Sequence, residues 1–252
     1  MTFQFRPVLT IFAVVGVAIL VSLGVWQLHR REWKLDLIAK TEARVKREPV
    51  PFEEAVQRAE VGEDMDYTPV ILKGVYANNL EAPVFGTLDG EAGGYIFTPL
   101  DISPPGGKQH FVYVDRGFVP QHLLAPQTRP EGEIAGEITV RGLFRSAENP
   151  AGIAKLFAPA DTQGDNLWFR RDPGAFAARQ GIEASPYYID SSGAENPAPW
   201  PKGGVTRLHF YNRHLEYALT WFGLAFALVG VYIASSLKPR QAAASGGQSS
   251  VS

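Results

Sequence analysis

The chain has 252 residues, enough for one or two domains, and its 24 basic and 26 acidic residues leave a formal net charge of −2. This balance lacks the positive excess of a nucleic-acid-binding protein, so no nucleic acid partner is expected. The absence of cysteine excludes disulfides, thiolate metal sites and a cysteine nucleophile.

Two uncharged apolar segments, residues 8–26 and 217–237, lie near the ends of the chain. Each is close to the ~20 apolar residues that a helix needs to cross ~30 Å of hydrocarbon, so both are predicted to be transmembrane helices. The first is too long for a signal-peptide core and has no small-residue cleavage site before Trp26, so we interpret it as an uncleaved anchor. Short cytoplasmic tails, residues 1–7 and 238–252, complete the chain, and the second is small, polar and expected to be disordered.

The segment between the spans, residues 27–216, is predicted to form one β-rich domain outside the membrane. It begins with residues 29–47, which contain neither Gly nor Pro and are expected to continue the first helix until Pro49. A short helix is predicted at residues 51–60, with proline at its start.

The rest of this domain alternates short β-type segments with turn residues. Aromatic and β-branched runs predict strands at residues 67–77, 82–88, 94–100, 110–120, 136–145, 166–172, 186–192 and 205–212. A helix is predicted at residues 172–182, with Asp172 as N-cap and Gly181 as stop. The expected fold class is an α+β membrane protein, in which two transmembrane helices, N- and C-terminal, flank a mainly antiparallel β barrel- or sandwich-like domain.

No catalytic motif stands out, so the protein is not expected to be an enzyme. The chain has five histidines, but they lie in no zinc-binding spacing, and it has neither a GxSxG elbow nor a Walker loop. Arg116, in "VDRGFVP", is either an anion clamp or a structural arginine paired with a carboxylate, with Gly117 as a β-bulge. The residues themselves leave both alternatives open.

Trp26, Arg30 and Lys34, in "WQLHRREWK", recur at helical spacing just beyond the first span. One interpretation is an aromatic belt with basic anchors for phosphates, which makes membrane lipid a partner. The other is a clamp for the carboxylates of an amphipathic ligand. Spacing alone does not decide between them.

The segment "NRHLEYALTWFG", residues 212–223, places a histidine at the start of the second span. Asn212 is expected to cap this helix, and His214, Tyr217 and Trp221 recur at i, i+3 and i+7 on one face. A helix N-terminus in low-polarity surroundings disfavours a charged imidazole, and the neutral form is the one that ligates iron. His214 is either such a ligand or an interfacial residue that hydrogen-bonds lipid or a loop.

Together these segments resemble the surfeit-locus (SURF) family of cytochrome c oxidase assembly proteins. The resemblance covers residues 24–224 in an ordered pattern: W-Q-x-x-R-x-x-K, then R-G-F-V-P, then N-x-H-L-x-Y-x-x-T-W-[FY]-G-L. It implies two spans and a large domain facing the periplasm in bacteria. Local charge counting would place that domain in the cytoplasm, but the positive-inside rule is weak for long loops. Because Arg6 is the one basic residue before the first span, the bacterial form, in the inner (cell) membrane, is expected.

The resemblance also implies a function, the assembly of haem–copper (cytochrome c or quinol) oxidases by binding haem a and aiding its insertion into the catalytic subunit. The family histidine maps onto His214, which would supply an axial ligand to the haem iron. Aromatic rings would pack the porphyrin, and cations would neutralise its propionates: Tyr217, Trp221 and Trp26, with Arg30, Lys34 or Arg213. The implied partners are oxidase subunit I and haem a synthase.

A rival interpretation is a membrane chaperone without a cofactor. Such a protein would dock haem a synthase or an oxidase subunit, and His214 would only shape an interface. A haem a absorption band in the purified protein separates the two interpretations.

Overall fold

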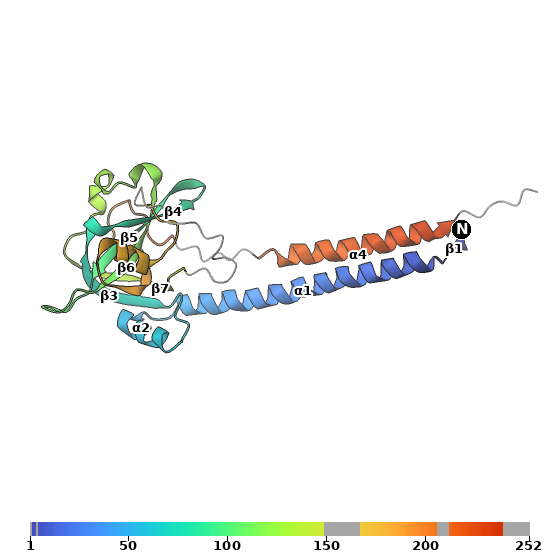
Figure 1. The fold of residues 1–252 in the computed structure, drawn as a ribbon, viewed down its shortest axis with the longest axis horizontal. Coiled ribbons are helices and arrows are strands. Elements are labelled where there is room, and N and C mark those ends of the chain that lie inside the picture. Colours follow the sequence, from blue (N-terminus) through green and yellow to red (C-terminus); the bar gives the residue numbers. More distant parts are fainter. Residues whose placement is uncertain (1, 4, 149–166, 206–211, 239–252) are drawn as a thin grey trace, which may run out of the picture. The chain divides into compact units, whose positions relative to one another are not determined.

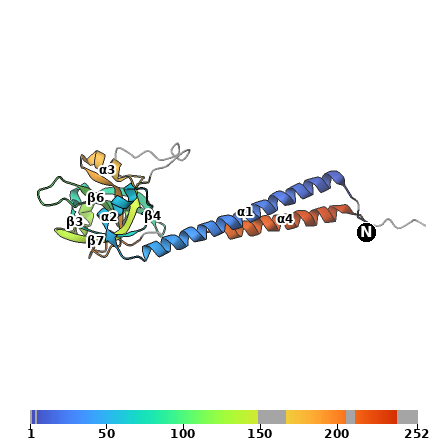
Figure 2. The same ribbon diagram turned by 90° about the horizontal axis from the view of Figure 1, so that it is seen from below.

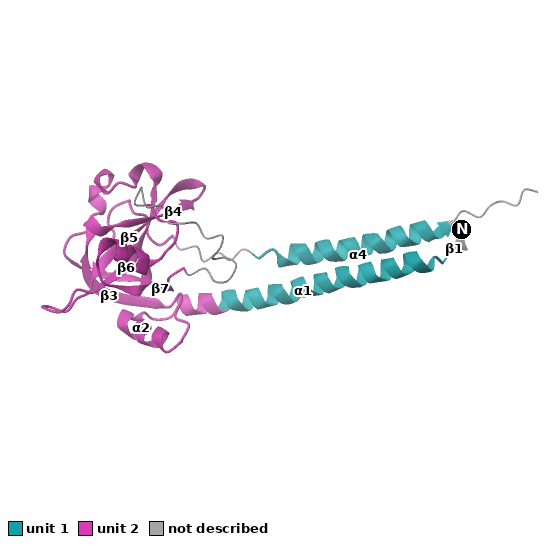
Figure 3. Ribbon diagram, viewed as in Figure 1, with its two compact units in different colours: residues 1–39, 209–252 teal, residues 40–208 magenta. Residues whose placement is uncertain are grey.

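The computed structural model describes residues 2–3, 5–148, 167–205 and 212–238 (Figure 1). The chain forms two compact units, residues 1–39 with 209–252 and residues 40–208, which Figure 3 distinguishes by colour. The first unit is built from long helices, and the second from a β barrel with two short α-helices.

Two long helices, α1 (Pro7–Val45) and α4 (His214–Ser236), supply the first unit. The predicted continuation of the first helix beyond the apolar segment is confirmed, and its 39 residues span roughly 58 Å at ~1.5 Å per residue. Both helices are long and apolar enough to cross a membrane. Two short strands, β1 (Thr2–Phe3) and β9 (Leu237–Lys238), pair antiparallel at their ends and were not expected from the sequence.

α1 and α4 lie side by side and run antiparallel (Figures 1 and 2). Towards one end of the pair, Thr10 Oγ1 lies 2.7 Å from the hydroxyl of Tyr232. Further along, a Cβ atom on Gly24 would lie 2.5 Å from the ring of Phe222. Glycine at this position therefore lets the Phe222 ring rest directly on the backbone of α1.

The second unit contains one sheet with the strand order β2-β3-β7-β8-β6-β5-β4. Its strands are β2 (Val50–Pro51), β3 (Pro69–Tyr76), β4 (Ala82–Leu88), β5 (Glu91–Asp101), β6 (Phe111–Pro120), β7 (Glu137–Ser146) and β8 (Ala184–Ser191). An additional pairing of β3 with β5 closes β3, β7, β8, β6 and β5 into a ring. All pairs in this ring are antiparallel except β6 with β8. The expected barrel- or sandwich-like domain is thus a mixed, mainly antiparallel barrel.

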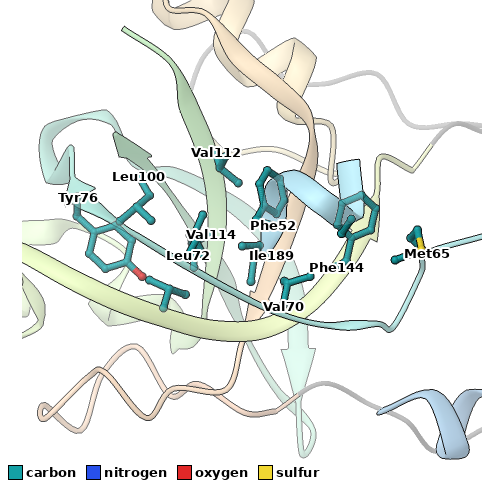
Figure 4. Close-up of a cluster of buried hydrophobic side chains, with 12 residues drawn as sticks. Phe52, Met65, Val70, Leu72, Tyr76, Leu100, Val112, Val114, Phe144 and Ile189 are labelled. Carbon is teal, nitrogen blue, oxygen red and sulfur yellow. The ribbon is translucent and has the colours of Figure 1, made fainter. Parts of the chain in front are cut away.

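Two short helices, α2 (Phe52–Glu60) and α3 (Pro173–Gln180), pack on this barrel. Strand β6 is buried along its whole length, because successive side chains point to opposite faces and both faces are covered. Val112 and Val114 join a cluster to which all five barrel strands contribute, together with Phe52 of α2 (Figure 4). Tyr113 points the other way and packs against Phe176 of α3, with ring centroids 5.3 Å apart.

The caps predicted for α3 are confirmed. Asp172 Oδ1 accepts a hydrogen bond from the Ala175 N–H at 3.1 Å, and Gly181 ends the helix with a left-handed φ of 67°. The sequence also places α2 and six of the strands within about three residues of their observed bounds, the usual uncertainty at element ends.

The strand predicted at residues 166–172 is wrong in its described part, residues 167–172. Only Trp168 pairs there, through an isolated bridge to Val84. The ring centroids of Trp168 and Phe176 lie 4.8 Å apart. Four residues later the chain reaches Asp172, the N-cap of α3, so this segment is too short to form a ladder of paired residues. Of the strand predicted at residues 205–212, residues 206–211 lie outside the described part of the chain.

Candidate functional site

His214, the histidine singled out in the sequence, is the first residue of α4. Its Nδ1 lies 2.7 Å from Oε1 of Gln27 on α1. Among the residues that the structure describes, Nε2 has no hydrogen-bond partner. The imidazole is therefore held from one side by the neighbouring helix, with its second nitrogen unused.

The prediction that Asn212 caps α4 is wrong, because the N-cap is Arg213 and no side chain caps the helix. Asn212 lies one residue further out, and its Oδ1 accepts a hydrogen bond from the His214 N–H at 3.3 Å. A bond over two residues is typical of an Asx turn, so Asn212 shapes the chain just before the helix.

The remaining expected residues of α4 lie beside His214. Tyr217 is 53% exposed, Arg213 is exposed and Trp221 is half-buried. At about 100° per residue, Arg213, Tyr217 and Trp221 occupy one side of α4, next to the face that meets α1. Aromatic rings and a positively charged side chain thus lie within about the first two turns of the helix.

Two of the three expected residues of α1, Trp26 and Arg30, are also exposed, and Arg30 has an aromatic partner. Trp26 is 56% exposed, and the guanidinium of Arg30 lies 3.9 Å from the ring centroid of Trp33, which is itself 52% exposed. This is the distance of a cation–π contact, in which the guanidinium lies over the face of an indole. Lys34 is half-buried, so it is a poorer candidate than the exposed Arg30 for ligand neutralisation.

The two groups of residues lie on a common flank of the helix pair. The helices are antiparallel and meet at Gln27 and His214, so helical geometry turns both groups to the same side. We call this surface the His214 flank, and its residues are Trp26, Arg30, Arg213, His214, Tyr217 and Trp221. Each of these six residues lies within about two helical turns of the contact between Gln27 and His214.

Sequence reasoning missed two side chains of this region, Gln27 and Trp33. Trp33 follows Trp26 by two helical turns, a spacing that could have revealed it. Gln27 stands next to Trp26 in the W-Q pair, but nothing local indicates that its amide meets a side chain 187 positions away.

The helix pair also contains a cavity, of about 430 Å³, but it lies at the opposite end from His214. Its lining is almost wholly apolar and includes Ala13, Val17, Val21 and Val229, with Thr10 and Tyr232 at one end. The His214 flank is an open surface of the pair, and this cavity is not part of it.

Arg116, the other residue with two open interpretations, is buried in the barrel unit. Its Nη1 lies 3.8 Å from Glu81 Oε1, its Nη2 donates to the carbonyl of Gly132, and its guanidinium lies 4.6 Å from the ring centroid of Tyr76. Burial lowers the pKa of Arg116. The structural alternative is therefore confirmed and the anion clamp is wrong.

The bulge predicted beside Arg116 is also present. Tyr95 pairs with Phe118 and Phe97 with Asp115, so β6 has one residue more than β5 at this point. Gly117 takes a φ of 113°, and a Cβ there would lie 2.0 Å from the Lys202 carbonyl oxygen.

A second group of charged residues lines a cavity of about 220 Å³ in the barrel unit. Asp115 is buried there, and Asp190, Arg145 and Arg171 are half-buried, beside Tyr67 and Tyr95. Arg171 Nε lies 4.0 Å from Asp115 Oδ2, and Gly117 N–H donates to Asp115 Oδ1 at 3.0 Å. Burial, and next the charge of Asp190, raise the pKa of Asp115 to about 8. Two arginines thus face two acidic side chains of the same unit, which indicates a structural cluster more than a ligand site.

A larger cavity, of about 770 Å³, lies beside the start of β4. Amide and carboxylate side chains supply much of its lining, including Asn78, Asn79, Gln121 and Glu133. This surface suits hydrogen bonding to another polypeptide better than it suits an apolar small molecule.

No three His, Cys, Asp or Glu side chains gather as a metal site anywhere in the described ranges. A metal held by the protein alone therefore has no ligand set there. A porphyrin brings four nitrogen ligands of its own and needs only an axial group from the protein, which a single histidine can provide.

Comparisons with known proteins agree with the resemblance noted in the sequence. The model of the SURF1 family matches residues 14–226. Surfeit locus protein 1 of Rattus norvegicus is 34% identical over 221 residues, covering 82% of this chain and 68% of that protein. Surfeit locus protein 1 of Homo sapiens is 34% identical over 222 residues, covering 82% and 70%. A SURF1-like protein of Caenorhabditis elegans is 25% identical over 232 residues, covering 84% and 69%.

Proposed function

Because this chain belongs to the SURF1 family, we propose that it is an assembly factor for haem–copper oxidases, which binds haem a at the membrane edge and aids its insertion into the catalytic subunit. The observation that carries the proposal is His214, with Nδ1 on Gln27 and Nε2 without a partner among the described residues. The proposed partners are oxidase subunit I and haem a synthase.

The chemistry of the His214 flank fits this cargo. An unprotonated imidazole nitrogen can ligate haem iron, so His214 would hold the cargo through one protein ligand and leave it exchangeable, as a carrier requires. Tyr217, Trp221 and Trp26 offer aromatic surface to a flat apolar ring. Arg30 and Arg213 are exposed cations that can pair with carboxylates.

We further propose that α1 and α4 cross the bacterial inner membrane and that the barrel unit faces the periplasm. The apolar windows of the two helices are only 6% and 11% buried within the protein, which suits lipid-facing surfaces. Because the chain has no cysteine, a single Glu137→Cys, at the exposed first residue of β7, can be probed with a membrane-impermeant maleimide. Labelling in intact spheroplasts supports this orientation, and labelling only after lysis contradicts it.

The haem proposal is tested by purifying the full chain from membranes of cells that make haem a and recording its absorption spectrum. The wild type should carry a haem a band, and His214→Ala should lose it while still inserting into the membrane, because the axial nitrogen is gone. His122→Ala, which removes an exposed histidine of the barrel unit, is the matched control and should keep the band.

Two other results have definite meanings. A His214→Ala variant with the wild-type spectrum would show that another group ligates the iron. A colourless wild type that still captures haem a synthase or oxidase subunit I would favour the cofactor-free chaperone. In that case the amide-lined cavity beside β4 is the surface to mutate first.

A further inference from the structure

We propose that Gln27 is a positioning residue, which fixes the neutral His214 ring in the tautomer protonated at Nδ1 and so keeps the Nε2 lone pair available for a ligand. The contact between Gln27 Oε1 and His214 Nδ1, at 2.7 Å, is within hydrogen-bond range. The assignment of the tautomer depends only on this contact, whereas its consequence for haem binding rests on the proposed function.

The chemistry of the two groups decides the direction of this bond. An amide oxygen only accepts, so the nitrogen facing it must carry the proton. A neutral imidazole has one N–H, and with that proton on Nδ1 the other nitrogen holds a lone pair. In water a histidine side chain prefers the opposite tautomer, with its proton on Nε2, and in that form Nε2 cannot ligate iron. The Gln27 contact thus selects the form that can bind.

The same contact also fixes the direction of the ring. Gln27 and His214 stand on different helices, and one turn below Gln27 the glycine at position 24 lets the ring of Phe222 rest on the α1 backbone. The side chain that holds the imidazole therefore belongs to a packed helix pair and is not a mobile loop residue. Metal-ligating histidines usually donate their second N–H to such an acceptor, and losing it typically costs 10–100-fold in metal affinity.

Magnetic resonance of the haem-free full chain, labelled with ¹⁵N-histidine in detergent at about pH 8, reads the tautomer directly, since an ordinary imidazole is neutral there. His214 is assigned by the signal missing from His214→Ala. In the wild type its Nδ1 should be protonated and its Nε2 not. Gln27→Leu has no side-chain oxygen to accept the Nδ1 proton, so it should shift the proton of His214 towards Nε2. Gln27→Glu retains an accepting oxygen and should leave the proton on Nδ1.

Thr10→Val is the matched control, because it removes a second interhelical hydrogen bond, to Tyr232, without touching the histidine. It should leave the His214 signals unchanged. If Gln27→Leu changes them no more than Thr10→Val does, or if wild-type His214 carries its proton on Nε2, the positioning role is wrong.

Titration of the same variants with haem a then separates this inference from the proposed function. Gln27→Leu should bind ~10–100-fold more weakly than the wild type, with Gln27→Glu close to it. If the wild type binds no haem a, the proposed function fails while the tautomer result stands. If the wild type binds it through His214 and Gln27→Leu binds equally well, the positioning inference fails and the proposed function survives.

Discussion

Replacing Glu81 with alanine removes the carboxylate that two buried arginines share. The side chain of Glu81 is 5% exposed, and those of Arg116 and Arg129 are 1% and 3% exposed. Arg129 forms an ion pair with Glu81 Oε2, and its Nη1 donates a hydrogen bond to Glu81 Oε1 at 3.1 Å. Arg116 Nη1 lies 3.8 Å from the same Oε1 atom. In Glu81→Ala, two guanidinium charges remain inside the barrel unit without this carboxylate.

The expected cost follows from the burial of these groups. Removing one partner of a buried ion pair destabilises a protein by ~3–5 kcal/mol, since the remaining charge stays desolvated and uncompensated. Arg116 keeps the ring of Tyr76 and the carbonyl of Gly132, so most of the loss falls on Arg129. For a domain of about 150–250 residues 1 kcal/mol lowers the melting temperature by ~2–4 °C, so a fall of roughly 6–20 °C is expected.

Hydrogen exchange of β6 in the purified full chain measures this loss, because the strand is buried along its whole length. Glu63→Ala, which removes an exposed carboxylate paired with Arg58, is the control and should cause no resolvable change. A double variant, Glu81→Leu with Arg129→Met, removes a charge with its partner and should be less destabilised than Glu81→Ala. If the β6 amides exchange at the same rate in Glu81→Ala and Glu63→Ala, the reasoning is refuted. A double variant that is less stable than Glu81→Ala refutes it as well.

Two further predictions concern the helix pair and the buried carboxylates. Gly24→Leu should separate α1 from α4, because even a Cβ there lies 2.5 Å from the ring of Phe222. Cysteines at Thr10 and Tyr232 should then crosslink more slowly than in the parent, and an unchanged rate contradicts this. Since the pKa of Asp115 is raised from 3.8 to about 8, the folded state binds the proton more tightly, and stability should fall as pH rises between these values. Asp115→Asn should reduce that slope, by at most ~1.4 kcal/mol per pH unit, in urea unfolding at several pH values, and an unchanged slope rules out Asp115 as its source.

Local chemistry explains why so many elements could be predicted from the sequence. The cap of α3 depends on Asp172 and Gly181, whose roles need only neighbouring backbone atoms. The length of α1 follows from a long stretch without Gly or Pro beyond the apolar segment. Residues 167–172 show the limit of such reasoning, because they have strand-type side chains but form only an isolated bridge, between Trp168 and Val84.

The closure of the barrel could not be predicted in the same way. A period of two residues says which side chains face the core, but it does not say which strands are neighbours. The pairing of β3 with β5 and the parallel pairing of β6 with β8 both join segments that are distant along the chain. Arg116 illustrates the consequence: its carboxylate partner, Glu81, lies on the connection to another strand, so the sequence left its role open.

The same distinction separates His214 from Gln27. The histidine is conspicuous in the sequence because a polar ring at the start of an apolar helix is costly unless it is hydrogen-bonded. Snorkelling towards lipid or a loop would turn the polar ring atoms away from the protein, whereas Nδ1 turns towards α1. One nitrogen thus meets the requirement for a hydrogen bond, and the other has no hydrogen-bond partner among the residues that the structure describes. That division of the two nitrogens suits an exchangeable ligand better than an anchor, and it makes α1 as necessary to the proposed site as the helix that carries the histidine.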